Sequence, residues 1–311
     1  MAANMKAVKL RIKSVQSTMQ ITKAMELVAS SKLRRAKERS DECRPYFREL
    51  HQTLVDIAEG NTDFSSVYAK SSSNERWCYV VIAGDRGLAG GYNSNIFKKL
   101  EAEAGQNASG EAAGYVVLPI GKKAVEYFKR RKVEILTEDF ATVADISVAD
   151  CFEIARLLCK EYREGRFGHI ELCYTEFVSM LSQRPEIYPM LPLTDLEDFK
   201  SGEYSDSQAP AGQETSSDGA KKTPVRDLIL YEPDSSEVFD AIVPEYLGGF
   251  IYGGVCDAVA SELAARRNAM EAATSNAEEM IEKLNLSYNR ARQSSITTEL
   301  TEIVAGAEGV G

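Results

Sequence analysis

Residues 261–310 read SELAARRNAMEAATSNAEEMIEKLNLSYNRARQSSITTELTEIVAGAEGV, with no proline and no glycine before Gly306. Nothing in this stretch breaks a helix, so it predicts one helix of roughly 70 Å at ~1.5 Å per residue. A compact domain does not need a helix of that length. We therefore expect it to reach beyond its own domain.

An apolar seam with heptad spacing follows this helix. Its steps alternate between four and three residues, which is the period of a left-handed coiled coil. The alternative is an ordinary amphipathic helix that lies on its own domain. The predicted seam consists of Val259, Leu263, Arg266, Met270, Ala273, Ala277, Met280, Leu284, Ser287 and Ala291.

The other end of the chain carries a second stripe of the same kind. No proline or glycine occurs before Pro45, and helical composition continues to about Gly60. Two long heptad-like helices at opposite ends predict an antiparallel coiled coil within the chain, with everything between them attached at one end. The second stripe consists of Met5, Val8, Ile12, Val15, Met19, Thr22, Met25, Ala29, Leu33 and Ala36.

The middle of the chain alternates apolar, β-forming runs with helical stretches. Strands are expected at 77–83, 115–120, 133–136 and 170–178, with a last one at 226–231. Helices are expected at 93–104, 122–131 and 148–164. This alternation predicts an α/β fold with a largely parallel sheet. The return helix is expected to begin near Pro244, because proline fits the first turn of a helix.

Gly84, Gly87 and Gly90 lie between the first strand and the first helix of this α/β domain, in GDRGLAGGYN. That placement invites a phosphate-loop or dinucleotide interpretation. The spacing is GxxGxxG, however, and the GK[ST] ending of a phosphate loop is absent. A tight strand-to-helix turn is the simpler interpretation. We expect no cofactor in this chain.

The charge is unevenly distributed. Residues 1–37 contain nine lysines and arginines and one acid, Glu26, although the whole chain has a net charge of −10. A basic helix can bind nucleic acid, a membrane surface or an acidic protein, or can simply be solvated. No aromatic residue falls among these basic positions to stack on bases, which disfavours nucleic acid.

The composition points away from catalysis and from a membrane span. The six cysteines form no CxxC pair, and the only histidines are His51 and His169, so neither a histidine-rich metal site nor a catalytic triad is expected. No apolar run approaches the ~18 residues of a membrane span. Residues 201–224 contain no Ile, Leu, Val, Phe or Met and predict a flexible insertion.

Three segments together resemble the gamma subunit of F-type ATP synthase. They are ITKAMELVASSKLRRA (residues 21–36), DRGLAGGYN (85–93) and NRARQSSITTELTEIVAGA (289–307), in the order of that family. The resemblance implies a Rossmann-like α/β foot domain on an antiparallel coiled coil. The expected boundaries are 1–60 for the first helix, 76–232 for the foot with its insertion 201–224, and 244–308 for the second helix.

The resemblance also implies a function: the central rotor shaft of a proton- or sodium-translocating ATP synthase. The chain is then a non-catalytic subunit. Its partners are three alpha and three beta subunits, the epsilon subunit and the membrane ring of c subunits, with no nucleic acid. The basic first helix would turn past acidic segments of the beta subunits. A stand-alone nucleotide-binding protein and a coiled-coil adaptor are the alternatives.

Site residues follow by motif from the same resemblance. The expected coupling or subunit contacts are Met25, Arg86, Lys98, Arg292, Gln293, Thr297 and Glu299. Ile296, Leu300 and Ile303, with Ala307, form a mostly apolar stripe that implies a hydrophobic bearing at the tip. The helix motif begins too close to the N-terminus to leave room for a removable leader. We therefore expect a bacterial protein, peripheral on the cytoplasmic face of the cell membrane.

Overall fold

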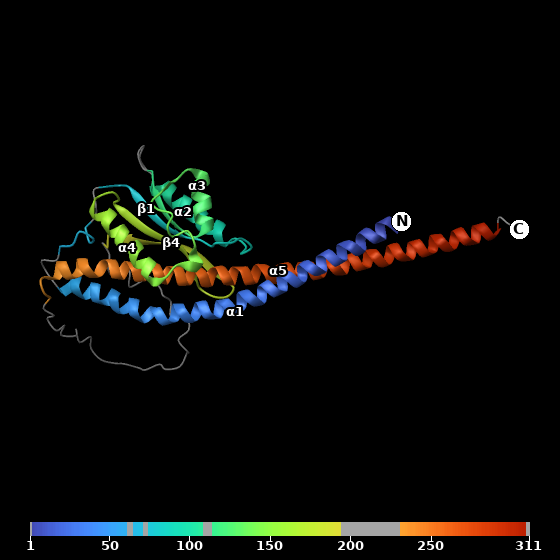
Figure 1. Cartoon of the computed structure of the whole chain (residues 1–311), viewed down its shortest axis with the longest axis horizontal. Coiled ribbons are helices and arrows are strands. Elements are labelled where there is room, and N and C mark those ends of the chain that lie inside the picture. Colours follow the sequence, from blue (N-terminus) through green and yellow to red (C-terminus); the bar gives the residue numbers. More distant parts are fainter. Residues whose placement is uncertain (1, 61–64, 71–73, 108–113, 194–230, 309–311) are drawn as a thin grey trace, which may run out of the picture.

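Two long helices and an α/β body make up the molecule, which we describe from a computed structural model (Figure 1). The structure describes residues 2–60, 65–70, 74–107, 114–193 and 231–308. The helices are α1 (Ala2–Gly60), α2 (Tyr92–Asn107), α3 (Lys122–Arg131), η1 (Val143–Asp145, a 3-10 turn), α4 (Val148–Arg163) and α5 (Ser235–Glu308). The strands are β1 (Trp77–Ile82), β2 (Val116–Ile120), β3 (Glu134–Ile135), β4 (His169–Phe177) and β5 (Gln183–Leu191).

The two long helices run antiparallel, as predicted. The Thr22 and Thr274 hydroxyl groups are hydrogen-bonded at 2.8 Å, while Leu33 packs with Ala260, Leu263 and Ala264. Residues later in α1 therefore pack against residues earlier in α5. Figure 1 shows the α/β body on one end of this pair and both chain termini at the other, with α5 reaching past the start of α1.

The seam on α1 is correct, but the seam on α5 is partly wrong. Every predicted α1 stripe position is buried or half-buried. On α5, Met280 and Ser287 are exposed, while Ile281 and Tyr288 turn inward. After Met270 the next interface positions are Thr274, four residues on, and Ala277, three residues further. Thr274 is polar, so an apolar pattern does not include it, yet its hydroxyl is hydrogen-bonded to Thr22 in the interface.

The sheet has the order β3-β2-β1-β4-β5, with β1 to β4 mutually parallel and β5 antiparallel to β4. The predicted largely parallel sheet is confirmed. β5 was missed, because its sequence contains Pro185 and Pro189. Proline is tolerated on an edge strand, where one side of the backbone has no ladder partner. The predicted strand 226–231 and the insertion 201–224 lie outside the described residues, apart from Tyr231.

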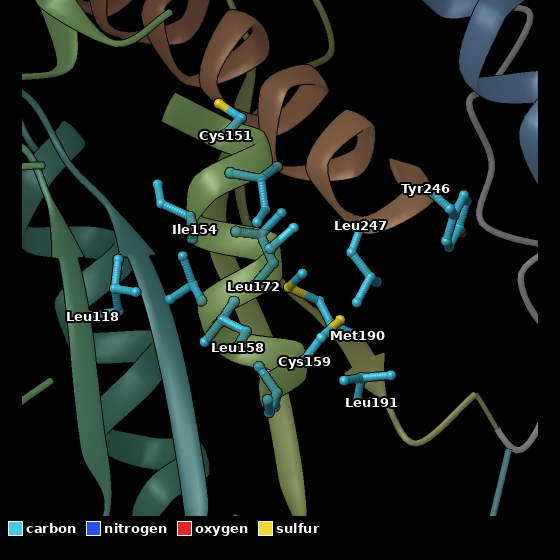
Figure 2. Close-up of a cluster of buried hydrophobic side chains, with 14 of the residues drawn as sticks. Leu118, Cys151, Ile154, Leu158, Cys159, Leu172, Met190, Leu191, Tyr246 and Leu247 are labelled. Atoms are coloured by element: carbon cyan, nitrogen blue, oxygen red, sulfur yellow. The ribbon is translucent and has the colours of Figure 1, made fainter. Parts of the chain in front are cut away.

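Buried side chains cover both faces of the sheet. α2 and α3 pack on one face, and the other face is covered by α4, α5 and the end of α1. Figure 2 shows Ile154 and Leu158 of α4 beside Leu118 and Leu172 of the sheet, with Leu247 of α5 close by. The main core therefore includes residues of both long helices as well as of the region 76–232.

The return helix starts earlier than predicted, at Ser235 and not near Pro244. The Asp234 carboxylate accepts hydrogen bonds from the backbone N–H groups of Ser236 and Glu237, which caps the first turn. Pro244 lies inside the helix, beside the fully buried Val243. The core packing at this level offsets the hydrogen bond that proline cannot donate.

Close contact between α5 and α4 depends on a glycine. A Cβ atom on Gly248 would lie 2.2 Å from Cδ1 of Phe152 on α4. A side chain at this position would force Phe152 or the two helices to shift. This close packing fixes the base of α5 to the α/β body, so that the rest of the helix projects from a rigid support.

Candidate functional site

The loop from Asp85 to Asn93 follows β1 and is held on one side by Asp85. Its carboxylate accepts hydrogen bonds from the backbone N–H groups of Lys122, Val143 and Ala144, at 3.1 to 3.2 Å. These groups open α3 and η1, and a helix start is where such a fold would hold a phosphate. Here a side-chain carboxylate already satisfies them. This geometry favours the structural turn over the nucleotide site.

The other side of the same loop is fixed to α5. Gly84 leaves room for Glu262, because a Cβ atom there would lie 2.8 Å from the Glu262 carboxyl group. Glu262 is ion-paired with Arg266, whose guanidinium also donates to the Gly87 carbonyl at 3.4 Å. The Tyr92 hydroxyl donates to the Ala258 carbonyl at 3.0 Å. The loop is thus part of the support for the long helix.

Arg86 lies in this loop and Lys98 lies just after it, and both side chains point away from the core. Both side chains are exposed, Arg86 in the loop itself and Lys98 on α2. The Asn93 side chain accepts from the Gly84 N–H and donates to the Arg86 carbonyl, which orders the backbone on both sides of Asp85. Both cations are therefore displayed on ordered elements, where a partner can reach them.

The polar residues predicted near the end of α5 are exposed as well. Arg292, Gln293, Thr297 and Glu299 all have exposed side chains, and the Thr297 hydroxyl donates to the Gln293 carbonyl of the same helix at 3.0 Å. Met25 is half-buried on α1, near the level of the Thr22–Thr274 pair. Arg292 lies roughly 25 Å further along α5, at ~1.5 Å per residue. Met25 and the four polar residues near the end of α5 therefore lie at different levels of the helix pair.

The tip of α5 carries an exposed apolar stripe. Ile303 is 68% exposed, and Ile296 and Leu300 also lie open to solvent. Val304 belongs to the same surface and was missed, although it stands four residues after Leu300. The i, i+4 spacing would have revealed it. Apolar side chains in this number on one exposed helix end indicate a surface that a partner covers.

The described residues contain no cluster of histidine, cysteine or acidic side chains that could hold a metal ion. The five cysteines among these residues are buried and form no disulfide, and burial raises the pKa of Cys78 and of Cys151 to about 12, which suppresses thiolate reactivity. His169 stacks on Trp77, with 4.2 Å between ring centroids, and burial lowers its pKa. None of the described helices is long and apolar enough to cross a membrane.

Comparisons with a family model and with individual proteins point to the same family. Residues 4–310 match the family model described as ATP synthase. The ATP synthase gamma chain of Ruminococcus albus is 46% identical over 304 residues, covering 97% of this chain and 96% of that protein. The sodium ion specific ATP synthase gamma chain of Acetobacterium woodii is 34% identical over 310 residues, covering 100% of both.

Solved structures share the fold. A chain of the Euglena gracilis mitochondrial ATP synthase, solved as OSCP/F1/c-ring, aligns with a TM-score of 0.60 at 16% identity, covering 100% of this chain and 95% of that one. A chain of the Tetrahymena thermophila mitochondrial ATP synthase central stalk and c-ring aligns with a TM-score of 0.53 at 20% identity, covering 81% and 99%.

Proposed function

The chain belongs to the ATP synthase gamma family, as a non-catalytic rotor subunit of the central stalk, and we propose from this how its parts are used. The long helix pair stands inside a ring of three alpha and three beta subunits. The α/β body is the foot, which receives torque from the membrane ring of c subunits together with the epsilon subunit. The complex lies on the cytoplasmic face of a bacterial cell membrane.

Asymmetry of the shaft is the basis of coupling. One chain inside a threefold ring presents a different face to each beta subunit at each rotational position. Different contacts give different free energies to the open and closed nucleotide sites, so the rotational position biases nucleotide affinity. The beta subunits hold the catalytic nucleotides. The ion that drives rotation, proton or sodium, is bound in the membrane ring.

The observation that carries this proposal is the free end of α5. Its polar side chains and its apolar tip lie exposed beyond the part of the helix that packs on the body (Figure 1). Arg292 and Gln293 donate hydrogen bonds to a beta-subunit loop, and Thr297 and Glu299 complete this polar contact. Arg86, Lys98 and Met25 contact beta subunits nearer the foot, and Ile296, Leu300 and Ile303 turn in an apolar collar.

Replacing the polar pair tests the coupling role. We expect Arg292→Ala with Gln293→Ala to impair ATP synthesis by the holoenzyme far more than assembly, because both side chains are exposed and support no packing. The measurements are synthesis rate in vesicles and recovery of the intact complex. Normal synthesis by the double variant would contradict the role. Lys283→Ala, also an exposed change on α5, is the control.

Shortening the tip tests the bearing. A chain ending at Glu302 lacks Ile303 and Val304, and we expect the complex to retain its shaft less firmly. Dissociation of the chain from the ring on dilution is the measurement. Unchanged retention and unchanged torque would mean that these side chains support no bearing.

A further inference from the structure

The backbone next to Arg86 is fixed by the carboxylate of the residue before it, Asp85. Its Oδ1 accepts from the N–H groups of Lys122 and Val143, at 3.2 and 3.1 Å. Its Oδ2 accepts from the N–H group of Ala144 at 3.1 Å. Hydrogen bonds to an ionised carboxylate are stronger than those to a neutral acceptor. Asp85 therefore ties the start of the loop to the starts of two other elements, α3 and η1.

The same short segment is held from the side of α2 by Asn93. The Asn93 Oδ1 accepts from the Gly84 N–H at 2.8 Å, and its amide nitrogen donates to the Arg86 carbonyl at 3.4 Å. The Gly84 carbonyl in turn accepts from the Lys123 N–H on α3 at 3.1 Å. The backbone on both sides of Asp85 is thus bound to α2 and to α3, although Arg86 itself lies in an exposed loop.

The turn that follows Arg86 is strained. Leu88 has a φ angle of 65°, in the left-handed region that residues with a Cβ atom rarely adopt. Such a conformation persists only where the surroundings hold it. The Leu88 side chain is 67% exposed, so its own packing does not hold the turn. The hydrogen bonds to the backbone at Gly84, Arg86 and Gly87 do so instead.

We propose that Asp85 is a positioning residue for Arg86, which restricts the contact of this guanidinium with a beta subunit to a narrow range of rotational positions. Asn93 has the same role from the side of α2. The inference rests on the proposed contact of Arg86 with a beta subunit, and it adds the residues that make this contact depend on the angle of the shaft.

Coupling requires that dependence on angle. A contact biases a beta subunit only by the difference in its free energy between rotational positions. An arginine on a mobile loop would follow one carboxylate across neighbouring positions, and the contact energy would then change little as the shaft turns. An arginine on a loop fixed by Asp85 makes and breaks its contact at a defined angle. Loss of Asp85 should therefore lower ATP synthesis more than ATP hydrolysis.

A double-mutant cycle in the holoenzyme tests the positioning role. Asp85→Asn keeps the size of the side chain but places an amide nitrogen where a carboxylate oxygen accepts a backbone N–H. Rates are taken per assembled complex in vesicles. We expect Arg86→Ala to lower synthesis about ten-fold, and Asp85→Asn to lower both synthesis and the ratio of synthesis to hydrolysis about three-fold.

The double variant separates positioning from an independent structural role. It should synthesise ATP at the rate of Arg86→Ala alone, because no guanidinium is left to position. Independent effects of Asp85→Asn and Arg86→Ala would multiply to a loss of about thirty-fold, and that result would overturn the inference.

Asp150→Asn is the matched control. The Asp150 carboxylate also accepts hydrogen bonds at a helix start, from the backbone N–H and the hydroxyl of Ser147, both at 2.7 Å. The substitution changes an acid into an amide in the same α/β body without touching the Arg86 loop. Synthesis per assembled complex should stay within about two-fold of normal. A loss equal to that of Asp85→Asn would show that general destabilisation lowers the rate, and would overturn the positioning role.

Asn93→Ala repeats the test from the other side of the loop, and it replaces Asp85→Asn if that variant does not assemble. We expect a loss of synthesis that does not multiply with the loss from Arg86→Ala. Normal synthesis by Arg86→Ala alone would count against the proposed beta-subunit contact itself. A loss with Arg86→Ala together with normal synthesis by Asp85→Asn and by Asn93→Ala would overturn the positioning role alone.

Discussion

The lower and upper parts of α5 form one continuous helix but are stabilised differently. Between Phe239 and Ala277 many of its side chains are fully buried against α1, α4 and the sheet. From Ile281 onward its most protected side chains are only half-buried, and its tip is open. The lower part is held by the core of its own chain. The upper part leaves polar and apolar side chains exposed, and we propose that other subunits of the complex cover them.

Substitutions at two isoleucines of this helix should show the largest difference in stability between the two parts. Ile251 is fully buried, and Ile251→Ala should cost about 2–5 kcal/mol of unfolding free energy, because it leaves a cavity in the core. Ile303→Ala, on the exposed tip, should change that free energy by less than about 0.5 kcal/mol. Urea unfolding of the isolated chain measures both. Similar losses of unfolding free energy at the two positions would contradict the difference between the lower and upper parts of α5.

The same contrast explains what the sequence could predict. Heptad spacing and the absence of breakers foretold the long helices, and the β-forming runs foretold the parallel strands. Strand β5 could not be predicted, because Pro185 and Pro189 argue against a strand in the sequence. They are tolerated because β5 lies at the edge of the sheet. The predicted seam of α5 departs from the observed one from Thr274 onward, because this polar residue occupies an interface position through its bond to Thr22.

The candidate site divides in a similar way. Arg86, Lys98, Arg292 and Gln293 were predicted from motifs, and all four side chains are exposed in the structure. The support under the loop could not be predicted, because Asp85 and Glu262 act across the fold on α3, η1 and Gly84. Contacts between residues this far apart in sequence leave no local pattern.

A buried carboxyl group in the α/β body should make the stability of the chain depend on pH. Burial, with a smaller contribution from Glu103, raises the pKa of Glu171 to about 7. Between about pH 4.5 and 7 the unfolded chain releases this proton while the folded chain keeps it, so stability should fall as pH rises through that window. We expect a loss of about 2 kcal/mol, removed by Glu171→Gln. Unfolding at pH 5 and pH 8 measures it, and an identical pH dependence in the variant would refute the assignment.

The threonine pair at the junction of the two parts should give the smallest effect. Thr22→Val leaves the Thr274 hydroxyl without its cross-helix partner and should cost about 1 kcal/mol. Adding Thr274→Val should recover part of that loss, since no buried hydroxyl then lacks its cross-helix partner. A double-mutant cycle by thermal unfolding measures the coupling. Strict additivity of the two changes would mean that the bond contributes nothing to the pairing.

The central claim is that this chain is a single asymmetric shaft inside a threefold ring. Purifying the complex through a tag on this chain and quantifying its subunits tests that claim most directly. The account predicts three alpha and three beta subunits for each copy of this chain. Equal numbers of the three, or recovery of the chain without alpha and beta, would contradict it.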